Sequence, residues 1–332
     1  MGGTHVSAGG TGLPGFGLLK VIVVTLAVGF VLGLGLGALT RDGSDEPRIV
    51  LTGGATQSVV VSIPPLKSLV EALADEAVPV SVLVPSGTTV HGWSPTPEDA
   101  RSVLTSGLMV TVGLGLEGGL SDLLAQRARV GRPHFQFATA VGIVSGTGHD
   151  DHEHEGHDHA HGPVDPHLWL DPALVERLIP ELARALVDAR LADRALIDSR
   201  ISTLRATISD VDIAYRSRLA PLSGKGAVVD HNAYTRLFSR YGLRQAGVVR
   251  PIETAEPTPE QIRRVVEAIE SGDASALLVE PQFSGGAARR VAELTDVRVG
   301  RIDPLGSGDW TAMMLSNLDA LVGVLSPSDE TE

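Results

Sequence analysis

The chain has 332 residues, no cysteine, 11 histidines and a formal net charge of −13 from 40 acidic and 27 basic side chains. The lack of cysteine excludes disulfides, thiolate zinc fingers, iron–sulfur clusters and a cysteine nucleophile, so a transition-metal site would use imidazole and carboxylate ligands. The acidic balance argues against nucleic acid as a partner, because that binding needs a clustered basic surface. The length predicts about two domains.

The N-terminal part of the chain predicts export. Residues 21–39 carry no charge, and as a helix they would span ~28 Å, close to the thickness of a bilayer core. Lys20 is the only Lys or Arg before this run, and a polar linker, 41–47, follows it. Residues 1–47 are therefore expected to be a signal or membrane-anchor segment with its linker, and cleavage and permanent anchoring both stay open. The rest would be extracytoplasmic, at the cell surface or in the periplasm.

After residue 48, apolar runs typical of strands alternate with amphipathic stretches, which is the pattern of an α/β fold with parallel sheets. In the first half we expect strands at 48–52 or 59–63, 78–84, 108–112 and 134–138, and helices at 65–74, 97–105 and 117–127. In the second half we expect strands at 226–230, 245–249, 276–279 and 298–302. The role of residues 48–57 stays open.

A long helical stretch joins the halves. Leucines recur every four residues from Leu174 to Leu186, and Asp171 followed by Pro172 is a typical helix start. A break near residues 192–193 would divide the stretch into two helices. The predicted organisation is an N-terminal lobe over 48–171, linking helices over 172–220 and a C-terminal lobe over 221–325.

One segment, 148–162, is a low-complexity tract that contains six histidines and five carboxylates. It has no core-forming side chains, so we expect a flexible loop. The loop could collect zinc or report its abundance, or it could be merely solvated.

Several motifs of catalytic and nucleotide-binding proteins are incomplete or absent in this sequence. The glycines of GLGLEG, 113–118, resemble a dinucleotide-binding turn, but no acidic residue follows at ~20 positions to bind a ribose. The chain also has no HExxH motif and no G-x-S-x-G motif.

Four other residues are better candidates for a functional site, as metal ligands. His91 lies in a Gly- and Pro-rich loop, and His167 lies between two Asp-Pro pairs. His231 and Asp303 each follow a predicted strand, at the sheet edge where ligand crevices form. Glu280, which ends another predicted strand, competes with Asp303 as the carboxylate ligand.

These segments resemble the solute-binding proteins of zinc and manganese ABC importers, of the ZnuA type in particular. The resemblance runs from about residue 59 to 325 and is carried by VPSGTTVHGWSPTPED, VGLGLE, the His-rich loop, DPHLWLDP, DHNAYTRLFSRYGL, VEPQFS and RIDPLGSG. It implies two α/β lobes joined by a long rigid helix, with metal in the cleft between them. It also implies ligands at His91, His167 and His231, and a carboxylate or water at the Asp303 position.

Three imidazoles with at most one carboxylate favour Zn²⁺ as the cargo over Mn²⁺, which prefers more oxygen ligands. The expected function is capture of Zn²⁺ outside the membrane and its delivery to the permease of an ABC importer by a monomeric, non-enzymatic protein. Because ligating histidines must be neutral, affinity should fall as pH drops through ~6.5. The alternatives are a manganese-binding member of the family, a zinc hydrolase with Glu280 as base, and a metal buffer in which the loop is the whole function.

Overall fold

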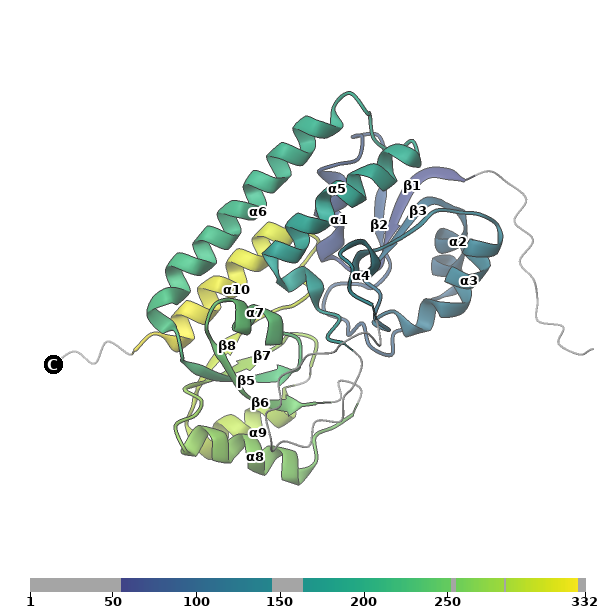
Figure 1. The fold of residues 1–332 in the computed structure, drawn as a ribbon. Helices are drawn as coiled ribbons and strands as arrows, with labels where there is room; N and C mark the ends of the chain where they lie inside the picture. The colour runs from purple at the N-terminus through teal and green to yellow at the C-terminus, as the bar shows by residue number, and fades with distance from the viewer. Residues whose placement is uncertain (1–54, 145–163, 252–254, 284, 328–332) are drawn as a thin grey trace, which may run out of the picture. The chain divides into compact units, whose positions relative to one another are not determined.

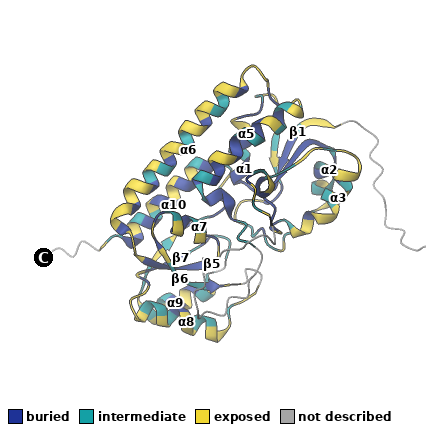
Figure 2. Ribbon diagram, viewed as in Figure 1, coloured by how far each residue is buried: buried dark blue, intermediate teal, exposed yellow. Residues whose placement is uncertain are grey.

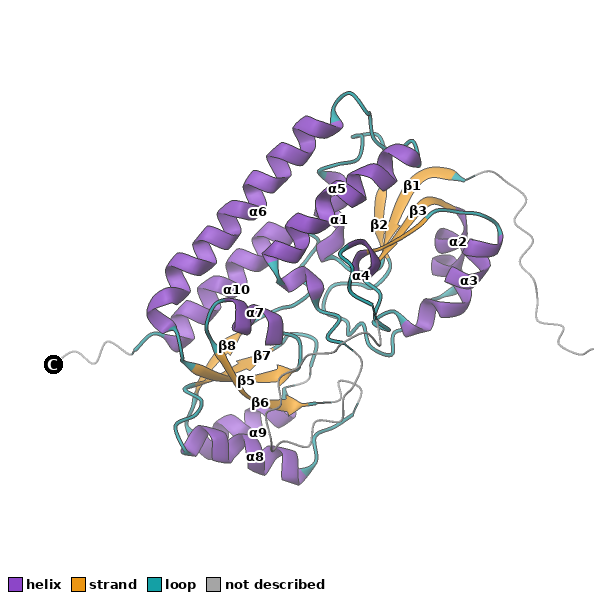
Figure 3. Ribbon diagram, in the orientation of Figure 1, coloured by secondary structure: helices purple, strands orange, loops and turns teal. Residues whose placement is uncertain are grey.

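Two four-stranded parallel sheets organise the residues that the computed structural model describes, which are 55–144, 164–251, 255–283 and 285–327 (Figure 1). Helices cover both sheets (Figure 3), so the predicted α/β class is confirmed. The predicted apolar segment 21–39, the linker 41–47 and the loop 148–162 lie outside the described residues. Among the residues that are described, no helix is both long and apolar enough to cross a bilayer.

The first sheet has the strand order β2-β1-β3-β4, from β1 (Thr56–Val61), β2 (Val80–Val82), β3 (Ser106–Thr111) and β4 (His134–Gln136). The first predicted strand corresponds to β1, and the alternative at 48–52 lies outside the described residues. The fourth predicted strand is shorter than expected. Its last two residues begin the short helix α4 (Phe137–Ala140), and the Ala138 amide still donates to Val112 O beyond β3.

Side chains of β1 alternate between two apolar layers. Val59 and Val61 face the core shared with α1 (Pro65–Glu71), whereas Val60 packs in a cluster with Val103 and Leu120. That second layer is formed by η1 (Gly118–Leu120), α2 (Pro97–Thr105) and α3 (Ser121–Arg129). Both faces of the sheet are therefore covered, as parallel sheets require.

The second sheet repeats this design with the order β6-β5-β7-β8, from β5 (Gly226–His231), β6 (Arg244–Arg250), β7 (Ala276–Val279) and β8 (Arg298–Arg301). Its outer face packs against α8 (Pro259–Glu270) and α9 (Gly286–Thr295) through Val228, Val265 and Val291. The inner face, which includes Val229, joins the main core with α7 (Thr235–Arg240) and α10 (Trp310–Leu325).

Two long helices join the sheets. α5 (Pro172–Asp188) begins at its N-cap Asp171, whose side chain accepts the Ala173 amide, and it continues through Pro180. The predicted break separates it from α6 (Ile197–Leu219), which leads through η3 (Ala220–Leu222) into β5. In Figure 1, α5, α6 and α10 lie side by side, and α6 extends along both lobes.

One continuous core contains buried side chains of both sheets and of these helices (Figure 2). The indole of Trp169, in η2 (Leu168–Leu170), donates to Pro304 O at 2.6 Å, and the indole of Trp310 donates to Trp169 O at 2.7 Å. The Trp310 amide donates in turn to Ser68 Oγ of α1 at 2.9 Å. These bonds connect the two lobes to the segment that carries His167.

Candidate metal centre

His91 is held by a tight turn in the loop after β2. The Trp93 amide donates to Val90 O at 3.1 Å, and Gly92 has φ +79°, a left-handed conformation that glycine adopts without strain. The loop after β3 packs closely on this turn, because a side chain at Gly119 would meet Trp93 O at 2.3 Å. The two loops therefore support each other at the carboxyl end of the first sheet.

That second loop is organised by Glu117. Its Oε1 accepts from Ser62 Oγ and from the Val112 amide, both at 2.7 Å, and its Oε2 accepts from the Gly113 amide at 3.0 Å. Burial raises the pKa of Glu117, although these bonds oppose the shift. The glycine-rich segment is thus a self-capped turn that places Leu116 at the site.

His167 is buried and is fixed by the carboxylate two residues before it. Oδ1 of Asp165 accepts from the His167 amide at 3.0 Å and lies 2.8 Å from the His167 Nδ1. The His167 ring lies against Trp169, with ring centroids 5.3 Å apart. With Nδ1 turned to Asp165, the Nε2 atom of His167 points away from the carboxylate.

Strand register places His231 beside Glu280. Val229 of β5 pairs with Leu278 of β7, so the positions two residues further along each strand are adjacent at the sheet edge. The Nδ1 of His231 lies 2.6 Å from Oε1 of Glu280, and both side chains are buried. This edge lies where the strand order reverses, the usual place for a ligand in an open parallel sheet.

The three histidines converge on one small cavity. His167 Nε2 and His231 Nε2 lie 3.2 Å apart, and the ring centroids of His91 and His167 lie 5.8 Å apart. The cavity volume is about 10 Å³, about the space of one water molecule or one ion. Its walls also include Glu280 and Gln282 and the apolar side chains of Val90, Leu116, Trp169, Pro304 and Leu305.

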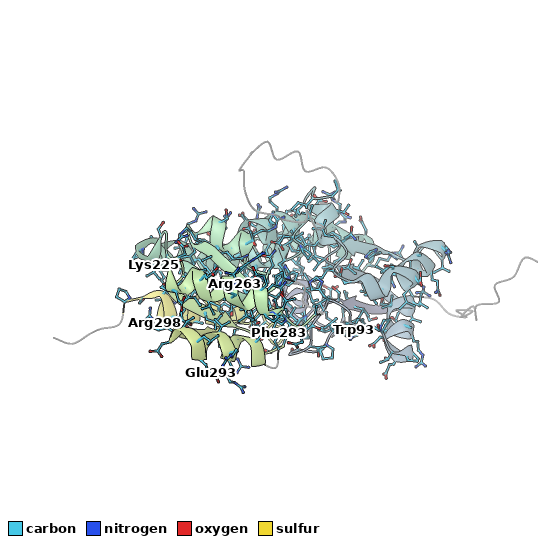
Figure 4. All side chains as sticks on the ribbon, turned by 90° about the horizontal axis from the view of Figure 1, so that it is seen from below. Trp93, Lys225, Arg263, Phe283, Glu293 and Arg298 are labelled. Carbon is cyan, nitrogen blue, oxygen red and sulfur yellow. The ribbon has the colours of Figure 1, made fainter. Side chains whose placement is uncertain are left out.

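Phe283 packs against His231 on the C-terminal lobe. Its ring centroid lies 5.6 Å from that of His231, and the guanidinium of the buried Arg250 lies 4.7 Å from the Phe283 centroid. In Figure 4, Phe283 lies on the side of this lobe that faces Trp93. The aromatic ring therefore shields His231 from solvent.

Asp303 is not among the side chains that line the cavity. It lies beyond β8, two strands from β5, and its Oδ1 accepts from Gln282 Nε2 at 2.6 Å and from the Leu305 amide at 2.9 Å. Of the two carboxylates that the sequence offered, Glu280 is therefore the one at the histidines, where it contacts His231.

Burial and neighbouring charges favour neutral imidazoles at the site. Burial, with the nearby His167 and His231, lowers the pKa of His91 to about 4, and burial also lowers the pKa of His167 against the opposing effect of Asp165. Both imidazoles therefore stay neutral to lower pH than an ordinary histidine, so protonation of their nitrogen atoms begins below the pH of ~6.5 expected from the sequence. Burial, and next the charge of Asp230, raise the pKa of Glu280 well above its usual range.

The arrangement is close to a metal site without being complete. Across the described part of the chain, no group of three or more His, Asp or Glu side chains already has the spacing to hold one ion. Two ligands on tetrahedral zinc lie about 3.3 Å apart when each Zn–N bond is ~2.05 Å. The Nε2 atoms of His167 and His231 have nearly that spacing, and the His91 ring centroid lies 5.8 Å from that of His167.

The fold is that of two-lobed α/β proteins in which long helices join parallel sheets. The chain belongs to the family described as zinc-uptake complex component A, periplasmic, whose model matches residues 59–324. This match confirms the family resemblance that the sequence indicated. It also confirms that the family is one of extracytoplasmic proteins.

Known relatives agree with this assignment. The high-affinity zinc uptake system protein ZnuA of Yersinia pestis is 27% identical over 270 residues, covering 76% of this chain and 85% of that protein. A crystal structure of ZnuA superposes with a TM-score of 0.69 at 24% identity, covering 82% of this chain and all of the other. The Mn²⁺ complex of the solute-binding protein FpvC of Pseudomonas aeruginosa gives 0.68 at 20% identity, covering 81% and 98%. The similarity to these two solved structures is one of fold.

Proposed function

We propose that this protein binds one Zn²⁺ between its lobes and delivers it to the membrane permease of an ABC-type metal importer. The proposal rests on the pair of Nε2 atoms 3.2 Å apart, each on a ring whose Nδ1 faces a carboxylate. When the Nδ1 atoms donate to those carboxylates, the two Nε2 lone pairs point at each other, and a cation relieves their repulsion. The family's place in a zinc-uptake complex supports the same function.

The ligand set that we propose is His91, His167 and His231, with water or a carboxylate in the fourth position. Among carboxylates, Glu280 is the better candidate because it lines the cavity, whereas Asp303 is occupied by Gln282. Three imidazoles favour Zn²⁺ over Mn²⁺. A manganese-binding protein remains the alternative, since a relative of the same fold carries Mn²⁺.

The cavity argues against a zinc hydrolase. A volume of about 10 Å³ leaves no room for an organic substrate beside a metal ion. A cavity of this size suits an ion carrier.

Other parts of the proposal concern segments outside the described residues. We propose that the His-rich loop, 148–162, raises the local zinc concentration, and that the apolar segment 21–39 directs export or anchors the protein as a monomer near the permease. The two lobes, 48–171 and 221–325, would then act as the walls of the carrier site, with the helices of 172–220 limiting their motion.

The test is zinc binding by the fragment 41–332, by a variant that lacks 149–161 and by variants with alanine at the cleft histidines. The proposal expects one tight zinc to survive the loop deletion and to be lost with His167→Ala or His231→Ala. Loss of tight binding with the loop deletion alone would show that the loop is the binding site and would refute the cleft site. A parallel titration with Mn²⁺ decides between the two cargo ions.

A further inference from the structure

Two arginines of α7 lie against the two aspartates that flank His167. Nε of Arg236 is 3.7 Å from Oδ2 of Asp165, and its Nη2 donates to the Asp165 carbonyl oxygen at 3.5 Å. One helical turn later, Nε of Arg240 is 3.3 Å from Oδ1 of Asp171. The two arginines are spaced i, i+4 and therefore project from the same face of α7.

Each aspartate fixes one end of the segment that carries His167. Asp165 accepts from both the backbone and the ring of His167 through Oδ1, which leaves its buried Oδ2 towards Arg236. Asp171 accepts the Ala173 amide and so begins α5. Holding both carboxylates consequently fixes the position of the imidazole between them.

The arginines belong to the part of the chain that carries His231. That histidine ends β5, and α7 begins four residues later at Thr235, so the strand end and the helix are connected by a very short segment. His167 lies in a different segment, before α5. Contacts between α7 and the two aspartates therefore link the segment of His167 to the segment of His231.

We propose that Arg236 and Arg240 are positioning residues for zinc binding, which hold His167 Nε2 at bonding distance from the ion that His231 binds. This inference rests on the proposed function. The arginines contact the aspartates and would not touch the metal, so they act through Asp165 and Asp171.

The contribution of these two ion pairs to the free energy of unfolding would not by itself explain why both aspartates are paired. The side chains of Arg236 and Arg240 are 28% and 23% exposed, and a groove of about 590 Å³ lies over them. Partly hydrated ion pairs contribute little to the free energy of unfolding. Their geometric effect on a ligand can still be large, because changes to the groups that orient metal ligands typically cost 10–100-fold in affinity.

The direction of the change in zinc affinity distinguishes a positioning role of the two arginines from a direct effect of their charge. Replacing an arginine by glutamine removes a positive charge near the cation, and by Coulomb's law alone this change would strengthen zinc binding. A loss of affinity would therefore run against the charge effect, as displacement of His167 predicts. Arg205 provides a matched control, since it forms a comparable ion pair, with Glu176 at 3.3 Å, and shares no carboxylate partner with Arg236 or Arg240.

The experiment compares the double variant Arg236→Gln/Arg240→Gln with Arg205→Gln in the full chain. Zinc affinity is measured by chelator competition, and Co²⁺ serves as a spectroscopic probe of the ligand geometry. We expect the double variant to lose about 10–100-fold in zinc affinity, with weaker visible absorption of bound Co²⁺. The control should change affinity by less than about twofold, and Arg236→Lys/Arg240→Lys should recover part of the loss.

Unchanged or increased zinc affinity in the double variant would overturn the inference, as would an equal loss in the control. An affinity loss with an unaltered Co²⁺ spectrum would also overturn it, because the ligand geometry would then be intact. Failure of the proposed function looks different: the alanine variants of His167 and His231 would themselves retain tight zinc.

Discussion

The Nε2 atoms of His167 and His231 lie 3.2 Å apart, although one residue precedes α5 and the other ends β5. Each ring is oriented from behind, by Asp165 at 2.8 Å and by Glu280 at 2.6 Å. The distance is close to the ~3.3 Å expected for two ligands of one tetrahedral zinc ion. In the proposed site these two ligands, one from each lobe, are therefore preorganised before the ion binds, and His91 of the N-terminal lobe would complete the set.

Alanine at the two buried histidines should affect zinc binding more than alanine at His91. We expect losses of more than about 100-fold for His167→Ala and His231→Ala, since each removes a preorganised ligand, and a smaller loss for His91→Ala. Isothermal titration or chelator competition measures the difference. His134→Ala is the control, because His134 contacts Thr111 Oγ1 and does not line the cavity. Equal affinity in all four variants would rule out the cleft site.

Mutation should distinguish between the two carboxylates, Glu280 and Asp303, that are candidates for a role in zinc binding. Glu280→Gln weakens the acceptor that orients His231, so we expect zinc affinity to fall about 10–100-fold. Asp303→Asn should have a much smaller effect, because the carboxylate of Asp303 contacts Gln282 and the Leu305 amide and does not reach the cavity. A larger loss for Asp303→Asn would instead identify Asp303 as the fourth ligand. Metal-free unfolding temperatures control for folding.

Sequence reasoning located both sheets because buried parallel strands are continuous apolar runs with strong turn signals between them. It also found the start of α5, where Asp171 and Pro172 act as expected. It failed at the end of β4, where the apolar residues Phe137 and Ala138 are buried in a helical turn. An apolar residue indicates burial in either conformation, so a short run of apolar residues does not distinguish a strand from a turn of helix.

At the site, the histidines were predictable because each lies at a loop or strand end with restricted backbone. The choice between Glu280 and Asp303 was not, since both follow strands and only the strand order puts β7 beside β5. The role of Asp165 was also missed. Its signal was present in the sequence: a carboxylate two residues before a histidine, with a proline between them, can bond both the backbone and the ring.

The metal-free protein should lose stability as pH falls from about 6.5 towards 4. Burial and the neighbouring His167 and His231 lower the pKa of His91 to about 4, whereas an imidazole in the unfolded chain titrates near 6.5. Between these values the unfolded chain binds a proton that the folded site does not, so the free energy of unfolding decreases with falling pH.

Urea denaturation of wild type and His91→Gln at several pH values measures this contribution. The raised pKa of Glu280 acts in the opposite direction but is common to both proteins, so the difference between them isolates His91. The variant should show a shallower dependence between pH 6.5 and 4. Parallel curves would mean that His91 keeps an ordinary pKa in the folded protein.

The Trp310 indole should contribute to stability and to the position of the cavity wall. Trp310 is fully buried and donates to Trp169 O, while Trp169 lines the cavity and contacts His167. Trp310→Phe leaves a void and an unpaired buried carbonyl, so we expect the free energy of unfolding to fall by about 2–4 kcal/mol. Calorimetry of the metal-free protein measures this loss.

Leu315→Ala is a matched control on the same helix, because Leu315 is one of the more exposed apolar side chains. It should change the free energy of unfolding by no more than about 0.5 kcal/mol. Because the Trp310 bond supports the segment that positions His167, zinc should also raise the unfolding temperature less in Trp310→Phe than in wild type. An equal zinc-induced shift in both proteins would confine the role of Trp310 to the core.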